Sequence, residues 1–125
     1  MERFFLDSSA IIQLLSGDAR GKAILDVLEG GEFYTNVICC VEAVNGANLD
    51  KVARVEAFLN KLHTLAVGYE EARIASGFAL SCRRKGGYVA AVDCLIAASA
   101  VSVGATLVTT DHDFERIAGV KVKVF

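Results

Sequence analysis

The chain has 125 residues, of which 54% are apolar and 22% charged, so it holds one domain with its own hydrophobic core and is too short for a multidomain protein. Thirteen Lys and Arg against fifteen Asp and Glu give a net charge of −2. This balance excludes a protein that grips nucleic acid by an overall basic surface, so a nucleic-acid partner must be held at a local site.

Short apolar stretches typical of strands alternate along the chain with longer amphipathic or apolar stretches typical of helices. The chain has no proline, so glycine marks the ends of these stretches. In the first half we predict, in chain order, a strand at 3–6, a helix between caps at 7–9 and a stop at Gly17, a helix at 18–29, a strand at 33–35 and a mostly apolar segment at 37–47. In the second half we predict a helix at 50–62, a strand at 64–67, helices at 70–85 and 93–103, a strand at 105–109 and an edge strand at 121–124.

This alternation predicts the α/β fold class: a three-layer α/β/α sandwich with a mainly parallel sheet of four to five strands, formed by one domain over 1–125. In such sheets ligand sites form beyond the carboxyl ends of the strands. We therefore look for function in the residues that follow each strand.

Location and redox state also follow from the sequence. An acidic residue at position 7 interrupts the N-terminal segment, so we expect no secretory signal. The longest uncharged run, 94–110, contains serine, glycine and threonine and predicts a helix followed by a strand, not a membrane span. The four cysteines lack a CxxC spacing, so we expect buried, reduced thiols in a cytoplasmic protein at Cys39, Cys40, Cys82 and Cys94.

Four acidic residues stand out by position. Asp7 and Asp111 each follow a predicted strand, while Glu42 and Asp93 lie in apolar stretches without a basic residue within a turn. A carboxylate in such surroundings needs a partner or stays protonated. Since the nearby sequence supplies no lysine or arginine, a divalent cation is the partner we expect, and oxygen ligands favour Mg²⁺ or Mn²⁺.

Each of these residues also has a structural interpretation. Asp7 and Asp93 are placed to cap the helices that follow them, Asp111 to form an Asx turn, and Glu42 to be an exposed acid on a helix. The coincidence of all four at one edge of the predicted sheet favours the metal site over the separate structural roles.

At these positions the chain resembles the PIN domain, specifically the ribonuclease toxins of VapBC toxin–antitoxin systems. The resemblance spans nearly the whole chain and is carried by four segments: Leu6-Asp7-Ser8-Ser9-Ala10-Ile11-Ile12, Glu42-Ala43-Val44-Asn45-Gly46, Asp93-Cys94-Leu95-Ile96-Ala97-Ala98 and Thr109-Thr110-Asp111-His112-Asp113-Phe114. It implies a Mg²⁺- or Mn²⁺-dependent endoribonuclease in which a metal-activated water cleaves RNA. The implied metal-binding and catalytic quartet is Asp7, Glu42, Asp93 and Asp111, with Ser9 as a supporting polar group.

The resemblance also implies partners: a single-stranded RNA substrate, a homodimer and a small antitoxin whose C-terminal segment covers the acidic cleft. The apolar composition fits a homodimer that packs through the predicted helices at 50–62 and 70–84. Discounting the quartet leaves eleven acidic residues against thirteen basic ones, so the net charge no longer argues against RNA.

The chain departs from the family pattern at two positions. Many members carry an acid two residues before the third acid and a threonine three residues before the acidic-helix glutamate, where this chain has Ala91 and Cys39. A second metal site is therefore expected to be weak. Asp113 is a candidate outer ligand or, alternatively, a cap for the turn that follows it.

Several basic residues have two interpretations. The run Arg83-Arg84-Lys85, and separately Lys51 and Arg54, could contact RNA phosphates or be solvated charges. His112, which follows Asp111, fits the role of an exposed loop residue better than that of a proton shuttle.

Other functions fit less well. A phosphatase of the haloacid dehalogenase type needs a second Asp where this chain has Ser9, and a metal-dependent adhesion site of the von Willebrand type needs a serine where it has Ile11. The open alternative is a catalytically inactive or RNA-processing PIN-like module that binds metal and serves in interaction.

Overall fold

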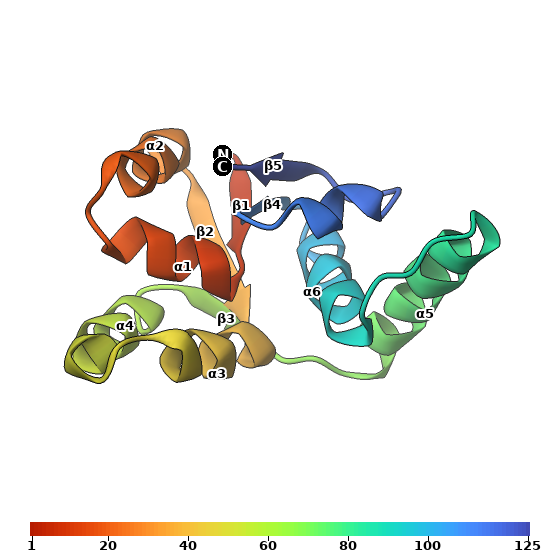
Figure 1. The fold of residues 1–125 in the computed structure, drawn as a ribbon, viewed down its shortest axis with the longest axis horizontal. Coiled ribbons are helices and arrows are strands. Elements are labelled where there is room, and N and C mark those ends of the chain that lie inside the picture. The colour runs from red at the N-terminus through yellow and green to blue at the C-terminus, as the bar shows by residue number, and fades with distance from the viewer.

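The computed structural model describes residues 1–125 as a five-stranded sheet with helices on both faces (Figure 1). All neighbouring strands pair in parallel, in the order β3-β2-β1-β4-β5. The strands are β1 (Arg3–Leu6), β2 (Glu32–Asn36), β3 (His63–Leu65), β4 (Thr106–Thr109) and β5 (Val122–Val124). The predicted sandwich is confirmed, with a sheet that is entirely parallel, and β5 lies at an edge as predicted.

The helices divide between the two faces of the sheet, as Figure 1 shows. One face carries α1 (Ser8–Leu15), α2 (Ala19–Leu28), α3 (Val37–Gly46) and α4 (Val52–Leu59), and the other carries α5 (Tyr69–Arg84) and α6 (Ala91–Ser102). Two short 3-10 helices complete the chain, η1 (Leu49–Lys51) and η2 (His112–Arg116).

The alternation of side chains along β1 builds a separate core on each face. Phe4 and Leu6 point into the cluster beneath α1 and α2, while Phe5 points into the cluster beneath α5 and α6. All three side chains are buried. Because successive residues of a strand face opposite sides, a short apolar strand is enough to hold both helical layers.

Element boundaries differ from the predictions in two informative places. The predicted helix at 50–62 begins as η1 and becomes α4 at Val52. After Leu59 it ends in tighter turns, in which the amides of Lys61 and Leu62 bond carbonyls three residues back. The expectation that Asp93 begins its helix is wrong. The helix α6 starts at Ala91, with Ala90 at the cap position, so the Asp93 carboxylate is not used as a cap.

The cysteines and the long uncharged run lie largely where they were expected. All four thiols are free, and three are buried, but Cys40 is only half-buried because it lies toward the open side of α3. The run 94–110 forms most of α6 and then β4, as predicted. None of the helices combines the length and the hydropathy that a membrane-spanning segment requires.

The order of the strands creates one crevice in the sheet. From β1 the chain moves outward to β2 and β3 on one side, and it then crosses over to place β4 on the other side of β1. The carboxyl ends of β1 and β4 therefore flank the point where the strand order reverses, which is where open parallel sheets bind ligands. Asp7 follows β1 and Asp111 follows β4.

Gly21 tests how closely α1 and α2 approach each other. A Cβ at this position would lie 2.4 Å from the carbonyl oxygen of Gln13 on α1. We expect Gly21→Ala to destabilise the protein by about 1 to 3 kcal/mol, because the overpacking outweighs the gain in helix propensity. Urea unfolding measures the difference.

Gly77 provides the matched control. It also lies inside a helix, α5, but a Cβ there meets nothing within 4 Å. Gly77→Ala should stabilise the protein by about 0.5 to 1 kcal/mol. Equal effects of the two substitutions would contradict the close contact at Gly21.

Candidate metal centre

The buried carboxylate of Asp7 lies at the carboxyl end of β1, where the strand order reverses. Its side chain is 4% exposed. Oδ1 accepts hydrogen bonds from the Ser9 hydroxyl at 2.7 Å and the Ala10 amide at 2.9 Å, and Oδ2 accepts one from the Thr109 hydroxyl at 2.6 Å. Asp7 therefore does cap α1, as the structural interpretation predicted, and it is also tied to β4.

The two hydroxyl groups that bind Asp7 also position the loop after β4. The Thr109 hydroxyl accepts a hydrogen bond from the Asp111 amide at 3.0 Å, and the Ser9 hydroxyl accepts one from the Thr110 amide at 3.0 Å. Each hydroxyl donates to Asp7 and accepts from this loop, so the backbone that carries Asp111 is fixed relative to the Asp7 carboxylate.

Sequence reasoning assigned Ser9 a supporting role but missed Thr109. The side chain of Thr109 is fully buried at the end of β4, two residues before Asp111. A threonine in that place reads as an ordinary β-branched strand residue. Only the pairing of β1 with β4 brings its hydroxyl to Asp7, which is 102 residues away in the chain.

A second buried hydrogen-bond network fixes the positions of the two helices that carry the other two acidic residues. Asn36 follows β2 and caps α3: its Oδ1 accepts from the Cys39 amide at 2.9 Å. Its Nδ2 donates to the Ser99 hydroxyl on α6 at 2.9 Å. Both side chains are fully buried, so α3, which carries Glu42, is fastened to α6, which carries Asp93.

The four predicted site residues differ in exposure. Asp7 is buried and Asp93 half-buried, whereas Glu42 and Asp111 are exposed. The apolar setting inferred for Glu42 is wrong, because α3 turns this side to solvent, where Val41 is also 70% exposed. The Ser8 hydroxyl lies 3.5 Å from a Glu42 carboxylate oxygen and donates to it.

The loop after β4 carries two acidic residues that sequence reasoning placed either as metal ligands or as caps. Asp111 caps η2, with its Oδ1 accepting from the Asp113 amide at 2.9 Å, so the predicted Asx-type turn is present. Asp113 is not a cap, because it lies inside η2, where its carboxylate is 3.8 Å from Arg116. The exposed His112 contacts Glu115 in the same turn.

The acidic groups interact strongly enough to alter their protonation. Burial, together with the charges of Asp111, Glu42, Asp113 and Asp7, raises the pKa of Asp93 to about 6. Burial also raises the pKa of Asp7, with the Asp111 charge adding to it, while the hydrogen bonds from Thr109, Ser9 and Ala10 oppose the rise. No lysine or arginine lowers either pKa.

These interactions show that one electrostatic field includes all four acids, although they come from four separate elements. As the side chains stand, no three acidic, cysteine or histidine groups converge on one point. The donor set still fits Mg²⁺ or Mn²⁺, because it consists of carboxylate oxygens beside hydroxyl groups and carries negative charge without a neutralising base. Cys39 adds no ligand, since burial, Asp7 and Glu42 all raise the pKa of its thiol.

Comparisons with known proteins agree with this fold. The family model of the PIN domain matches residues 4–120. No curated protein matches the chain. Solved structures give 47 matching chains, and they include proteins from several bacteria.

Three of these structures illustrate the likeness. VapBC2 from Rickettsia felis, bound to a DNA fragment from its promoter, has 18% identity, a TM-score of 0.81 and coverage of 98% of each chain. DNA-bound VapBC from Salmonella typhimurium has 25% identity, a TM-score of 0.80 and the same coverage. The sarcin-ricin loop cleaving toxin VapC20 of Mycobacterium tuberculosis has 18% identity, a TM-score of 0.71, and coverage of 94% of this chain and 95% of its own.

The Thr109 hydroxyl gives a test of the Asp7 network. Thr109→Val keeps the shape of the side chain but leaves Asp7 without one donor and the Asp111 amide without its acceptor. We expect a loss of about 1 to 3 kcal/mol in the free energy of unfolding. Thr109→Ser, which keeps the hydroxyl, should lose less, and a valine variant as stable as the serine variant would contradict the network.

Asp93 gives a test by pH. Its folded pKa of about 6 exceeds the ordinary value of 3.8, so the ionised carboxylate destabilises the metal-free fold. The penalty is absent below pH 3.8, grows as the pH rises to about 6, and is complete above that. Allowing for solvent screening, Asp93→Asn should stabilise the metal-free protein at pH 7.5 by about 1 to 2 kcal/mol.

Urea unfolding in the presence of a chelator measures this effect at pH 7.5 and again at pH 4. The difference between wild type and Asp93→Asn should nearly vanish at the lower pH. A variant less stable than wild type at pH 7.5 would show that Asp93 has a favourable partner.

Proposed function

The chain belongs to the PIN domain family, and on this premise we propose that it is a metal-dependent endoribonuclease, the toxin of a VapBC-like toxin–antitoxin pair. One observation carries the proposal. Four acids from separate elements interact at the reversal point of the sheet, and no basic residue lowers the pKa of either Asp7 or Asp93. A cation and an anionic substrate together satisfy such a site, whereas a purely structural role leaves its charge uncompensated.

Some residues of the proposed site bind the cation, and others orient the residues that bind it. Asp7, Glu42, Asp93 and Asp111 are the proposed ligands, and Ser9 and Thr109 orient Asp7. When bound, Mg²⁺ or Mn²⁺ would make a water more acidic and neutralise charge that develops on the phosphate during hydrolysis. Asp113 is a proposed outer ligand, with Arg116 holding its carboxylate at 3.8 Å.

No side chain needs to act as the nucleophile in this proposal. The hydroxyls of Ser9 and Thr109 donate to the buried Asp7 carboxylate and are not directed at a substrate. The Cys39 thiol is buried, and its raised pKa keeps it protonated. The side chains therefore act by binding the cation and orienting the phosphate.

The departures at positions 39 and 91 favour one strong metal site over two. Cys39 is fully buried against the core and Ala91 has no donor atom, so neither supplies an oxygen ligand. A single cation on the quartet is sufficient for the proposed hydrolysis.

RNA is the proposed substrate, in a single-stranded segment that can reach the crevice. The similar VapC20 is a toxin that cleaves the sarcin-ricin loop, which makes an RNA substrate a reasonable proposal for this chain too. Single-stranded segments can bend a phosphate into a small site more easily than a duplex can. The proposed setting for this reaction is the cytoplasm.

The proposed protein partners are an antitoxin and a second copy of the chain. Another similar solved structure is a toxin–antitoxin complex from Klebsiella pneumoniae, with a TM-score of 0.76. A basic residue of an antitoxin could compete with the cation for the quartet. Exposed apolar side chains on or beside α4 and α5 support a homodimer through these helices: Leu49, Tyr69 and Leu80.

The function is tested by cleavage of a labelled single-stranded RNA with and without Mg²⁺. We expect cleavage that stops when a chelator is added, and that falls at least about 100-fold in both Asp7→Asn and Asp93→Asn. Glu29→Gln, an exposed acid at the end of α2, is the matched control and should retain full activity.

Two outcomes would overturn the proposal. Activity that survives both substitutions would place the catalytic site elsewhere. Mg²⁺ that raises the melting temperature without any cleavage of RNA would instead identify the chain as a metal-binding PIN-like module that serves in interaction.

A further inference from the structure

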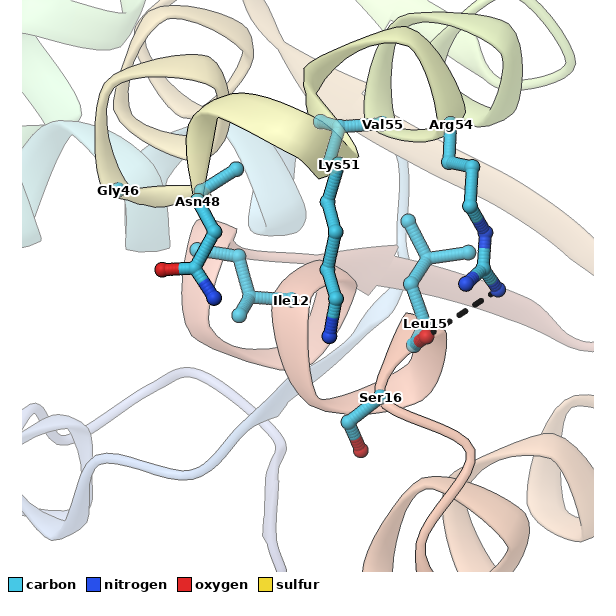
Figure 2. A pocket seen from close by; sticks show the side chains of 9 residues that line it. Ile12, Leu15, Ser16, Gly46, Asn48, Lys51, Arg54 and Val55 are labelled. Carbon is cyan, nitrogen blue, oxygen red and sulfur yellow. Dashed lines mark hydrogen bonds between the residues drawn. The ribbon is translucent and has the colours of Figure 1, made fainter.

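A pocket outside the metal centre lies between the end of α1, the end of α3 and the start of α4 (Figure 2). Its volume is about 150 Å³. Ile12, Leu15 and Val55 form its apolar wall, and Ser16, Asn48, Lys51 and Arg54 supply its polar groups. None of the residues that line it is acidic.

The two cations of this pocket have no acidic partner. The ion pairs of the structure involve Arg3, His112 and Arg116, not Lys51 or Arg54. Both side chains are exposed, and Figure 2 shows them extending from the α4 side toward the last turn of α1. Arg54 Nη2 donates to the Leu15 carbonyl at 3.3 Å, which anchors one end of the guanidinium and leaves its other donors free.

The pocket is formed by the same two helices, α1 and α3, that bring Ser8 and Glu42 together. Ser8 on α1 contacts Glu42 on α3, and the residues four positions further along these helices, Ile12 and Gly46, line the pocket. The helices stay close there, since a Cβ on Gly46 would lie 3.1 Å from Ile12 Cδ1. The pocket thus begins one helical turn, about 5.4 Å, from the Ser8–Glu42 contact.

The cations lie further along α1 than the start of the pocket. Arg54 contacts Leu15, which is seven residues or about 10.5 Å along α1 from Ser8, a distance that corresponds to about three stacked nucleotides. A strand whose reacting phosphate lies at the quartet would place the backbone of a nearby nucleotide at Lys51 and Arg54. The negative centre needs a cation to accept a phosphate, but this pocket already carries its positive charge.

We propose that this pocket binds the backbone phosphate and sugar of an RNA nucleotide within about three of the cleaved one, an inference that rests on the proposed function. Lys51 and Arg54 pair with the phosphate, and Ile12, Leu15 and Val55 pack against the sugar. Lys51 and Arg54 are therefore the positioning residues that set the register of the strand across the metal centre.

Charge complementarity favours RNA over an acidic protein segment as the occupant. An acidic peptide in the pocket would lie one to two helical turns from the Glu42 carboxylate, on the side where the acidic quartet repels it. RNA brings the phosphate that the cation-loaded quartet requires, so the negative centre and the positive pocket serve one ligand. An overall charge of −2 also makes such a local pair of cations necessary for binding RNA.

The test compares Lys51→Met/Arg54→Met with Arg83→Met/Lys85→Met, which removes the same two kinds of charge at the exposed end of α5. The first readout is binding of a labelled single-stranded RNA in the presence of a chelator, so that no cleavage is needed. We expect about tenfold weaker binding for the pocket variant only. The slope of the logarithm of its binding constant against the logarithm of the salt concentration should also be smaller in magnitude by about 0.7 to 1.4.

A second readout examines the position of the pocket on the strand. For Mg²⁺-dependent cleavage, the pocket variant should raise KM about tenfold and leave kcat nearly unchanged, since the contact is equal in the ground and transition states. The RNA is also shortened toward the cleaved bond, from one end in one series and from the other end in a second series. In only one of the two series should the shortening make the KM values of wild type and the pocket variant equal. Lys51→Arg/Arg54→Lys, which keeps both charges, should restore most of the affinity.

The outcomes separate this inference from the proposed function. RNA binding that depends on the pocket in a protein that does not cleave would refute the nuclease and keep the pocket. Equal losses in both methionine variants would overturn the pocket as a site, because they would reflect bulk charge. A lower melting temperature with unchanged RNA affinity, or loss of antitoxin binding alone, would overturn it as well.

Discussion

The buried carboxylate of Asp7 is the constraint on which the functional edge of the sheet depends. It ends β1, caps α1 and accepts a hydrogen bond from Thr109 at the end of β4. The same hydroxyl groups that bind it hold the amides of Thr110 and Asp111. A buried carboxylate is tolerated only when its oxygens are satisfied, so the network fixes the two strand ends and the loop after β4 as a unit.

This unit carries an electrostatic cost that the fold alone does not relieve. Burial and neighbouring acids raise the pKa values of Asp7 and Asp93, and Arg116 in the loop after β4 lies against Asp113. The Asn36–Ser99 hydrogen bond keeps α3 beside α6 and so prevents the acids on these helices from separating. A bound cation would convert this cost into affinity for phosphate, and the positive pocket further along α1 and α3 would extend the surface available to a strand.

Much of the architecture could be predicted because it depends on local patterns. The alternation of apolar strands and capped helices indicated a parallel sandwich, and the positions of Asp7 and Asp111 after their strands placed them at one edge. The environment of Glu42 could not be predicted, because an apolar stretch does not reveal which side of α3 faces solvent. The helix that carries Asp93 was predicted to start two residues too late, because sequence signals for helix starts are uncertain by a residue or two.

The sequence by itself determined the elements, their order and the identity of the acids, since each of these follows from residues close together in the chain. Only the tertiary structure decided that Thr109 binds Asp7, that Asn36 binds Ser99, and that Lys51 and Arg54 share a pocket with α1. The hydrogen bonds join residues 102 and 63 positions apart. Such contacts depend on strand order and helix packing, which bring distant residues together without leaving a local pattern.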